Sequence, residues 1–161
     1  MSDVNMFSHI NDKGEALMVD VSAKDTTVRR ALASGKIFMS KEAFDLLMDN
    51  KIPKGDVFAV ARVAGIMAAK RTPEIIPLCH TLLLEKVTID FVPDADENSV
   101  KALCEVRLTG KTGAEMEALT GVSTALLTIY DMCKAVDKNM MITDVVLEEK
   151  EGGKSGNLRR E

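Results

Sequence analysis

Apolar and polar residues alternate along two segments near the middle of the chain. Apolar side chains occupy every second position in residues 86–91, and the same period recurs in residues 100–108, which is typical of half-buried strands. Turn-forming residues at 93–98 separate the two segments, so the pattern predicts an antiparallel hairpin. Short apolar runs at 16–21 and 140–147 predict two further strands.

Apolar residues recur at helical spacing in three other segments. Ser40 is a favourable N-cap for a first predicted helix, which ends by Pro53. A second helix, residues 55–70, is apolar around nearly its whole circumference, so we expect the sheet and another subunit to cover most of it. The third, at about 113–138, has one apolar stripe, and Thr112 is expected to cap it.

The order of these elements predicts the fold class. From Ile37 onward it runs strand, helices, two strands, helix, strand, which is typical of an α+β, ferredoxin-like split βαβ fold with an antiparallel sheet packed on helices. We expect a single domain over residues 1–161, with a loose N-terminal arm at 1–15 and a mobile C-terminal tail at 148–161. This fold class does not specify a function.

Composition narrows the classes of partner. The chain has 21 Lys and Arg against 25 Asp and Glu, and only 4% aromatic residues, so nucleic acid is not an expected partner and any anion site must be a local cluster. Three widely spaced cysteines fit neither a disulfide framework nor a CxxC zinc site, which favours a cytoplasmic location. No apolar run reaches the roughly 20 residues of a membrane-spanning helix, and no signal peptide is recognisable.

One face of the 113–138 helix is the first candidate for chemistry. Opposite the apolar stripe lie several Thr residues together with Glu117, Asp131 and Lys134. Asp131 and Lys134 are neighbours on the helix surface because they are three residues apart. Such a pair is either a weak ion pair on a solvated face or, inside a cleft, an acid and a base that shift each other's pKa.

Three other local features are ambiguous by themselves. The glycine-rich turn 108–113 lacks the first glycine of a P-loop, because Glu105 stands there, and a direct phosphate role for Lys111 is not favoured. Cys79–His80 either pack in the core or line a site. Lys54 precedes a predicted helix, where a cation opposes the helix dipole, so it is either an ordinary surface lysine or held for an anionic ligand.

Longer segments carry a far more specific pattern. They are KGDVFAxAR at 54–62, AGIxAAK at 64–70, IPLCH at 76–80, LTGKTGxEMEALT at 108–120, LTIYDMCKAV at 127–136 and GGKSG at 152–156, and MVDVS at 18–22 also fits. Together they resemble the MoaC-type cyclic pyranopterin monophosphate synthases of molybdenum cofactor biosynthesis. The resemblance spans nearly the whole chain in the family's order.

This resemblance implies a lyase that converts (8S)-3′,8-cyclo-7,8-dihydroguanosine 5′-triphosphate to cyclic pyranopterin monophosphate and releases diphosphate. It implies a homohexamer, a trimer of dimers, with sites at subunit boundaries. Carried over by position, the expected catalytic residues are Asp131, Lys134 and Lys54, and the expected substrate-binding residues are Leu78, Cys79, His80, Met116, Glu117, Glu115, Arg29 and Lys150. A Mg²⁺ ion bound through the substrate phosphates is compatible with this chemistry, and neither a metal held by the protein nor a redox cofactor is expected.

One position departs from the family pattern. The family's LCHP reads LCHT here, with Thr81, which frees φ and restores a backbone N–H. One alternative function is a non-catalytic, nucleotide-binding regulatory module of ferredoxin-like fold. Another is a nucleotide phosphohydrolase, which would release diphosphate from ordinary GTP.

Overall fold

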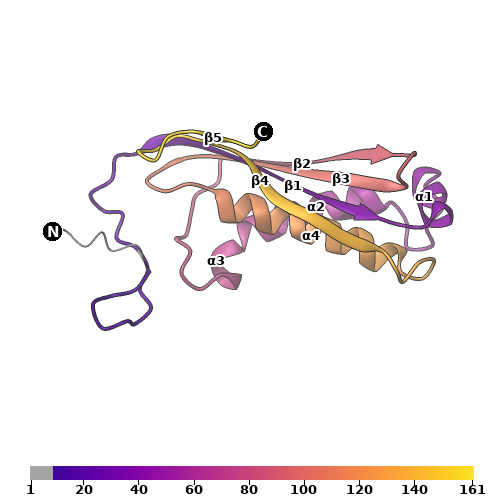
Figure 1. Ribbon diagram of the computed structural model, residues 1–161, viewed down its shortest axis with the longest axis horizontal. Helices are drawn as coiled ribbons and strands as arrows, with labels where there is room; N and C mark the ends of the chain where they lie inside the picture. Colours follow the sequence, from indigo (N-terminus) through magenta and orange to yellow (C-terminus); the bar gives the residue numbers. More distant parts are fainter. Residues whose placement is uncertain (1–8) are drawn as a thin grey trace.

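The computed structural model describes residues 9–161 and shows one antiparallel sheet with helices packed on one face of it (Figure 1). Its elements are β1 (Thr27–Phe38), α1 (Lys41–Met48), α2 (Val57–Lys70), α3 (Thr72–Ile75), β2 (Lys86–Asp94), β3 (Ser99–Gly110), α4 (Glu115–Cys133), β4 (Met141–Glu151) and β5 (Leu158–Arg159). The strand order is β2-β3-β1-β4-β5, and every neighbouring pair is antiparallel. The first four strands with α2 and α4 form the predicted ferredoxin-like split βαβ arrangement.

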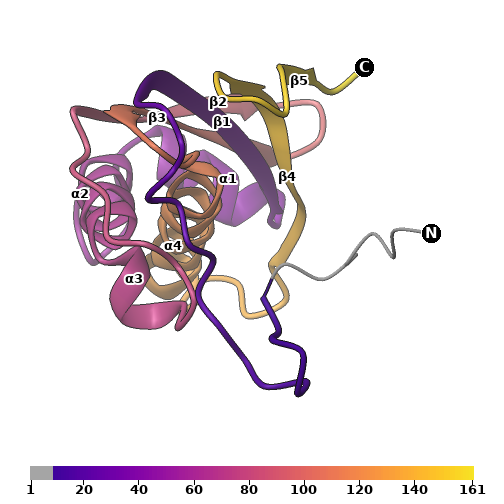
Figure 2. The ribbon, with the colours of Figure 1, turned by 90° about the vertical axis from the view of Figure 1, so that its left-hand side faces the viewer.

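The core lies between the sheet and α4, which crosses beneath the central strands with α2 beside it (Figure 2). Alternate residues of β1 and β3 face the helices, as the period-two pattern requires. The buried side chains at this interface include Ala31, Ala33, Ile37, Val100, Cys104, Val106 and Leu108 from the strands and Ala118, Val122, Leu126 and Ile129 from α4. Each large aliphatic side chain buried here stabilises the fold by about 1.5–3 kcal/mol.

Two glycines set the spacing between α2 and α4. A Cβ atom on Gly65 would lie 2.9 Å from the carbonyl oxygen of Gly121, and one on Gly121 would lie 2.7 Å from Sγ of Cys104. The Gly121 Cβ atom would also lie 3.2 Å from the carbonyl oxygen of Gly65. Glycine at both positions therefore allows the backbones of α2 and α4 to approach closely, and Gly121 also lets α4 pack against Cys104 of β3. The start of α2 therefore lies near the end of α4, and the loop after α3 lies near the start of α4.

The predicted strand at 16–21 is wrong. Within residues 9–26 the only pairing is an isolated bridge between Ile10 and Ala16, and the first strand is β1. Small residues occupy much of the buried face of β1 and polar residues its other face, so its apolar period is weak in the sequence. Residues 1–8 of the predicted arm lie outside the described residues.

The ends of the later elements also differ from the prediction. α4 ends at Cys133, and its N-cap is Ala114 without a side-chain hydrogen bond, so Thr112 does not cap it. Residues 148–151, predicted as part of a mobile tail, continue β4, and residues 149–151 pair with β1. β5 then pairs back onto β4, and hydrogen bonding to a neighbouring strand holds this segment where composition alone indicated a loose tail.

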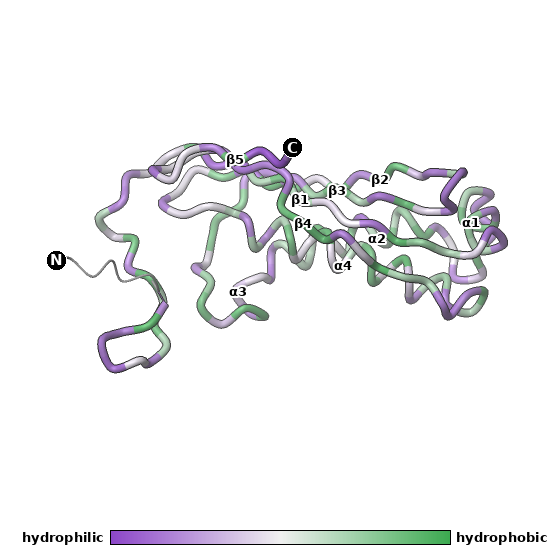
Figure 3. The backbone as a smooth tube through the Cα atoms, viewed as in Figure 1, coloured by the Kyte–Doolittle hydropathy of each residue, from purple (hydrophilic) through white to green (hydrophobic). Residues whose placement is uncertain are grey.

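The outer surfaces differ in character. Hydrophilic residues gather at the turn between β2 and β3 and in the C-terminal segment (Figure 3). On the outer sheet face Arg30 forms ion pairs with Glu105 (2.7 Å) and Glu149 (2.6 Å). The outward face of α2 exposes Val60, Val63 and Met67. No helix within residues 9–161 combines the length and the apolar character needed to span a bilayer.

Candidate active site

The start of α4, the loop after α3 and the N-terminal segment lie toward the left of Figure 1. Residues of these three segments line a cavity of about 730 Å³. A second cavity of about 510 Å³ shares Lys24, Thr112, Gly113 and Glu115 with the first. Six of the predicted substrate-binding residues line the larger cavity: Leu78, Cys79, His80, Glu115, Met116 and Glu117. The other two, Arg29 and Lys150, line the smaller one, so the structure brings all eight together.

Glu117 is the most perturbed acid of this region. Its side chain is only 3% exposed, and burial, reinforced by the charge of Glu115, raises its pKa to about 7. Burial and the nearby Glu117 also raise the pKa of Cys79. Of the two interpretations of the polar face of this helix, a solvated face or a cleft, the structure supports a cleft at Glu117, because other segments cover the first turn of α4. A carboxyl that titrates near neutral pH suits general acid–base chemistry.

The smaller cavity is strongly cationic. Five cations, Lys24, Arg29, Lys111, Lys150 and Lys154, face two acids, Asp25 and Glu115. The Nζ atom of Lys150 lies 2.6 Å from Oε1 of Glu115. Arg29 is only 7% exposed, and it forms no ion pair with any of residues 9–161. A buried charge without a counter-ion is costly, so this cavity is suited to an anion that supplies one.

The GGKSG segment wraps around the Arg29 side chain. Gly153 has φ +84°, and a Cβ atom there would overlap Nη1 of Arg29. The glycine therefore allows both the backbone conformation and the close approach. Lys154 and Ser155 of the same segment line the cavity, and the Arg29 Nε–H donates to the carbonyl oxygen of Gly110 (3.3 Å).

The three predicted catalytic residues meet at the other end of α4. Lys54 Nζ lies 2.9 Å from Oδ2 of Asp131, and Lys134 Nζ lies 2.9 Å from Oδ1. Hydrogen bonds from Lys54 and then Lys134 lower the pKa of Asp131 to about 2, and the bond to Asp131 raises the pKa of Lys134. The Asp131 side chain is 55% exposed, so this trio lies on an open surface of the single chain and not in a cleft.

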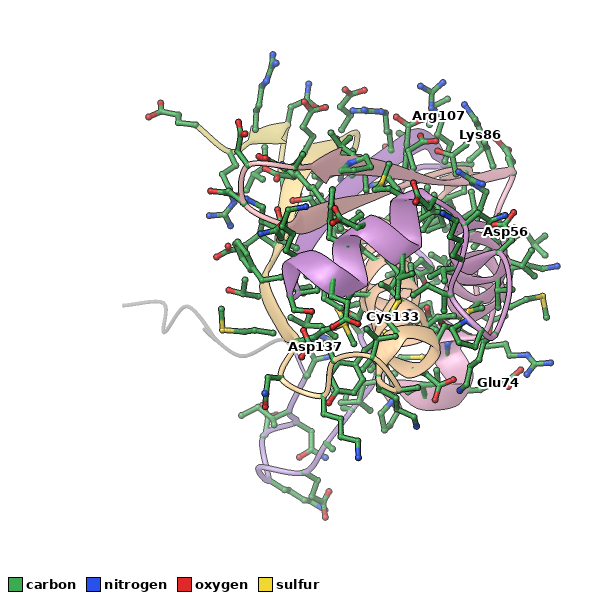
Figure 4. The ribbon with its side chains drawn as sticks, turned by 90° about the vertical axis from the view of Figure 1, so that its right-hand side faces the viewer. Asp56, Glu74, Lys86, Arg107, Cys133 and Asp137 are labelled. Carbon is green, nitrogen blue, oxygen red and sulfur yellow. The ribbon has the colours of Figure 1, made fainter. Side chains whose placement is uncertain are left out.

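Local contacts fix the geometry of this end of the molecule. Lys54 also donates to the backbone carbonyl of Asp131 (3.1 Å), in the last turn of α4, where a cation is favourable. Asp137, labelled in Figure 4 with Cys133, accepts a hydrogen bond from the Ser40 N–H (2.7 Å). Asp56, also labelled there, accepts from the Ala59 N–H and caps α2 just after Lys54.

The candidate residues thus fall into two groups at opposite ends of one helix. α4 has 19 residues, and a helix of that length is about 28 Å long. One nucleotide-sized molecule cannot contact both groups on a single chain. The separation between Glu115 and Asp131 follows from the sequence once both residues are assigned to one helix. The sequence did not indicate that Lys24 lines the cavities, because Lys24 lies in a segment without a regular hydrophobic period.

Metal-binding side chains do not cluster in the described part of the chain. Residues 9–161 contain no group of three or more His, Cys, Asp or Glu side chains placed to hold a metal ion. The three cysteines are all free thiols.

Comparison with known proteins gives a consistent result over the whole chain. Residues 18–153 match the model of the MoaC family. The chain is 52% identical to the cyclic pyranopterin monophosphate synthase of Clostridium acetobutylicum over 160 residues, which are 99% of this chain and 98% of the relative. It is 55% identical to the protein of that name from Chloroflexus aurantiacus over 97% of this chain and 96% of the relative, and 56% identical to that from Campylobacter jejuni subsp. doylei over 95% and 98%.

Proposed function

The chain belongs to the MoaC family, and on that premise we propose that it is a cyclic pyranopterin monophosphate synthase of molybdenum cofactor biosynthesis. The reaction converts (8S)-3′,8-cyclo-7,8-dihydroguanosine 5′-triphosphate to cyclic pyranopterin monophosphate and releases diphosphate. One observation of the structure carries the proposal: the buried Arg29, without an ion-pair partner in residues 9–161, lies in a cationic cavity that adjoins the cavity of Glu117 and His80.

In this proposal the cationic cavity binds the phosphates. Negative charge develops on diphosphate as it leaves, and fixed cations in a low-dielectric site stabilise that charge in the transition state. Arg29, Lys150 and Lys154 line the cavity from β1, β4 and the GGKSG segment. A Mg²⁺ ion would be bound by the phosphate oxygens of the substrate, since Mg²⁺ is commonly held that way without an all-protein cage.

The proton transfers of ring opening and pterin formation need groups that gain and lose protons near neutral pH. Glu117 has such a pKa, about 7, because it is buried. Asp131 does not, because its two lysine partners hold its pKa at about 2 while it faces solvent. Desolvation of Asp131 beneath another protein surface would raise its pKa and strengthen its coupling to Lys134.

We therefore propose that each active site is built from two chains. Two copies related by a twofold axis, with their α4 helices antiparallel, would place the Asp131 group of one copy beside the cavities of the other. The exposed Val60, Val63 and Met67 on α2 support association, since contiguous exposed apolar side chains mark interaction surfaces. The hexamer, a trimer of dimers, is proposed from the family resemblance, and free thiols at all three cysteines support a cytoplasmic location.

The direct test is turnover of the cyclised triphosphate by purified protein. Diphosphate release and a pterin that becomes fluorescent on oxidation are expected, with no diphosphate from ordinary GTP. Binding of the substrate without product would favour the regulatory module, and release from GTP would favour a phosphohydrolase. Either result contradicts the proposal.

The two-chain site has its own test by complementation. Asp131→Asn and Arg29→Gln are each expected to lower turnover at least about 100-fold as homo-oligomers. Coexpression of the two variants should restore about one quarter of wild-type activity, because random pairing leaves one intact site in half of the dimers. No recovery in verified mixed oligomers would show that each site belongs to one chain.

A further inference from the structure

Residues 17–24, here called the strap, run along one side of the 730 Å³ cavity. Val19, Val21 and Lys24 of the strap line the cavity, as does His9 earlier in the N-terminal segment, and the Val19 carbonyl contacts His80. Val19 and Val21 are half-buried, whereas Met18 before them, Asp20 between them and Ser22 after them are exposed. The MVDVS segment therefore turns its two valines toward the cavity and its polar residues toward solvent.

The strap has its own internal turn. The Ser22 N–H donates to Oδ1 of Asp20 (2.8 Å), and the Lys24 N–H donates to the carbonyl oxygen of Val21 (3.0 Å). Asp and Ser commonly stabilise turns in this way. These bonds shape the strap, but they do not attach it to the rest of the molecule.

Within residues 9–161, two side-chain hydrogen bonds attach the strap to the body of the protein. Nε2 of His80 lies 2.7 Å from the carbonyl oxygen of Val19 and must carry the proton, because a carbonyl only accepts. Lys111 Nζ donates to the carbonyl oxygen of Ser22 (2.7 Å). The strap belongs to no sheet, so few polar contacts and two half-buried valines hold it, and its free energy of opening is expected to be low.

We propose that the strap is the movable wall of the substrate cavity and that Lys111 is the positioning residue that holds it closed. This inference rests on the proposed function for the identity of the substrate. Opening of the strap would admit the substrate, and its closure would exclude water while protons are transferred. The ammonium group of Lys111 acts through Ser22, which accounts for a lysine in a glycine-rich turn that lacks the P-loop pattern.

Hydrogen exchange measured by mass spectrometry tests the strap without any substrate. Full-length wild type would be compared with Lys111→Met, Lys111→Arg and the control Lys41→Met, whose lysine lies on α1 and pairs with Asp45. Loss of the charge-assisted bond in Lys111→Met should accelerate exchange of the Ser22 and Lys24 amides about tenfold. Lys111→Arg and the control should match wild type. Unchanged exchange in Lys111→Met would overturn the proposal that Lys111 holds the strap closed.

Kinetics then test the link to catalysis. With the cyclised triphosphate, Lys111→Met should raise KM about tenfold and leave kcat within about twofold, and Lys111→Arg should restore KM. Lys111 also lines the cationic cavity, so a raised KM with unchanged hydrogen exchange would assign Lys111 to phosphate binding and overturn its positioning role. Faster exchange with an unchanged KM would overturn the positioning role of Lys111. If wild-type protein does not turn the substrate over, the proposed function fails, and the exchange experiment still decides whether the strap is held by Lys111.

Discussion

Glu117 illustrates how position in the fold changes the chemistry of one residue. Helical spacing places it on the polar side of α4, yet its carboxyl is buried beside Cys79 and its pKa is raised to about 7. Asp131, on the same helix, has its pKa lowered to about 2 by two lysines. Two carboxyl groups of one helix thus differ in protonation at neutral pH because of their neighbours.

The raised pKa of Glu117 predicts a pH-dependent stability difference. Between its ordinary value of 4.5 and about 7, the folded state keeps a proton that the unfolded state releases, so wild-type stability falls as pH rises through this window. Glu117→Gln lacks this loss, and its free energy of unfolding relative to wild type should increase by about 3 kcal/mol from pH 4 to pH 8. Urea unfolding of both proteins across this pH range measures the difference in free energy of unfolding. Glu74→Gln, on an exposed residue of α3, is the control, and parallel profiles for Glu117→Gln and wild type would contradict the expectation.

We expect the protein to tolerate the family's proline in place of Thr81. Thr81 is exposed, and its N–H donates to no group among residues 9–161, while His80 is oriented through Nε2 and the Val19 carbonyl. Thr81→Pro should therefore change stability by no more than about 1 kcal/mol and leave turnover within a few-fold of wild type. Assays beside Thr81→Ala check this, and a large loss for the proline variant alone would show that the backbone at this position orients His80.

At the scale of elements, the glycine contact between α2 and α4 does more than pack two helices. The crossing brings Lys54, just before α2, to Asp131 near the end of α4. It also brings the loop of His80 to the first turn of α4. One close helix pair thus positions both groups of candidate residues.

Widening this crossing should destabilise the protein. In Gly121→Val the added side chain would overlap Cys104 and approach the backbone of Gly65, and overpacking of this kind costs about 3 kcal/mol. Thermal unfolding compared with Thr124→Val, which places the same side chain at a half-buried position of α4, measures the effect. Equal unfolding temperatures for the two variants would mean that the helices separate without cost.

At the scale of the whole molecule, the two groups of candidate residues define a need for a second chain. The trio at Asp131 is open to solvent, and Glu115 at the cavities lies 16 residues earlier on α4, a rise of about 24 Å along the helix. Positive charge is also concentrated at one of the two ends. The smaller cavity has five cations, although the chain as a whole has a net charge of −4. The proposed dimer would place the Asp131 end of one chain beside the cavities of the other.

The exposed apolar row on α2 predicts where association can be broken. Val63 is 61% exposed, and Val63→Lys places a charge in a surface proposed to be buried between chains, which is costly. A smaller mass by light scattering and a loss of turnover of at least about tenfold are expected. Met48→Lys, on an exposed residue of α1, is the control. An unchanged mass for Val63→Lys would place the interface elsewhere.

Periodicity predicted the elements whose burial is one-sided and whose residues are large. The β2–β3 hairpin and α4 are confirmed, because alternation or helical spacing of big apolar side chains reports directly on burial. β1 was located only by Ile37, because alanines and a glycine on its inner face carry little hydrophobic signal. Residues 149–151 pair with β1, which is remote in the sequence, so no local sequence pattern predicts this pairing.

The sequence by itself determined the fold class, the family and the residue types available for chemistry, because periodicity and long motifs are local properties of the chain. Only the tertiary structure decided how those residues are grouped. A solvent-exposed trio lies at one end of α4. A buried acid, a strap and an arginine buried without an ion-pair partner among residues 9–161 lie at the other. The physical reason is that desolvation and charge pairing depend on neighbours remote in sequence. The pKa of Glu117 is raised because other segments of the chain cover its carboxyl. Arg29 is suited to binding an anion because it is buried in the lining of the smaller cavity.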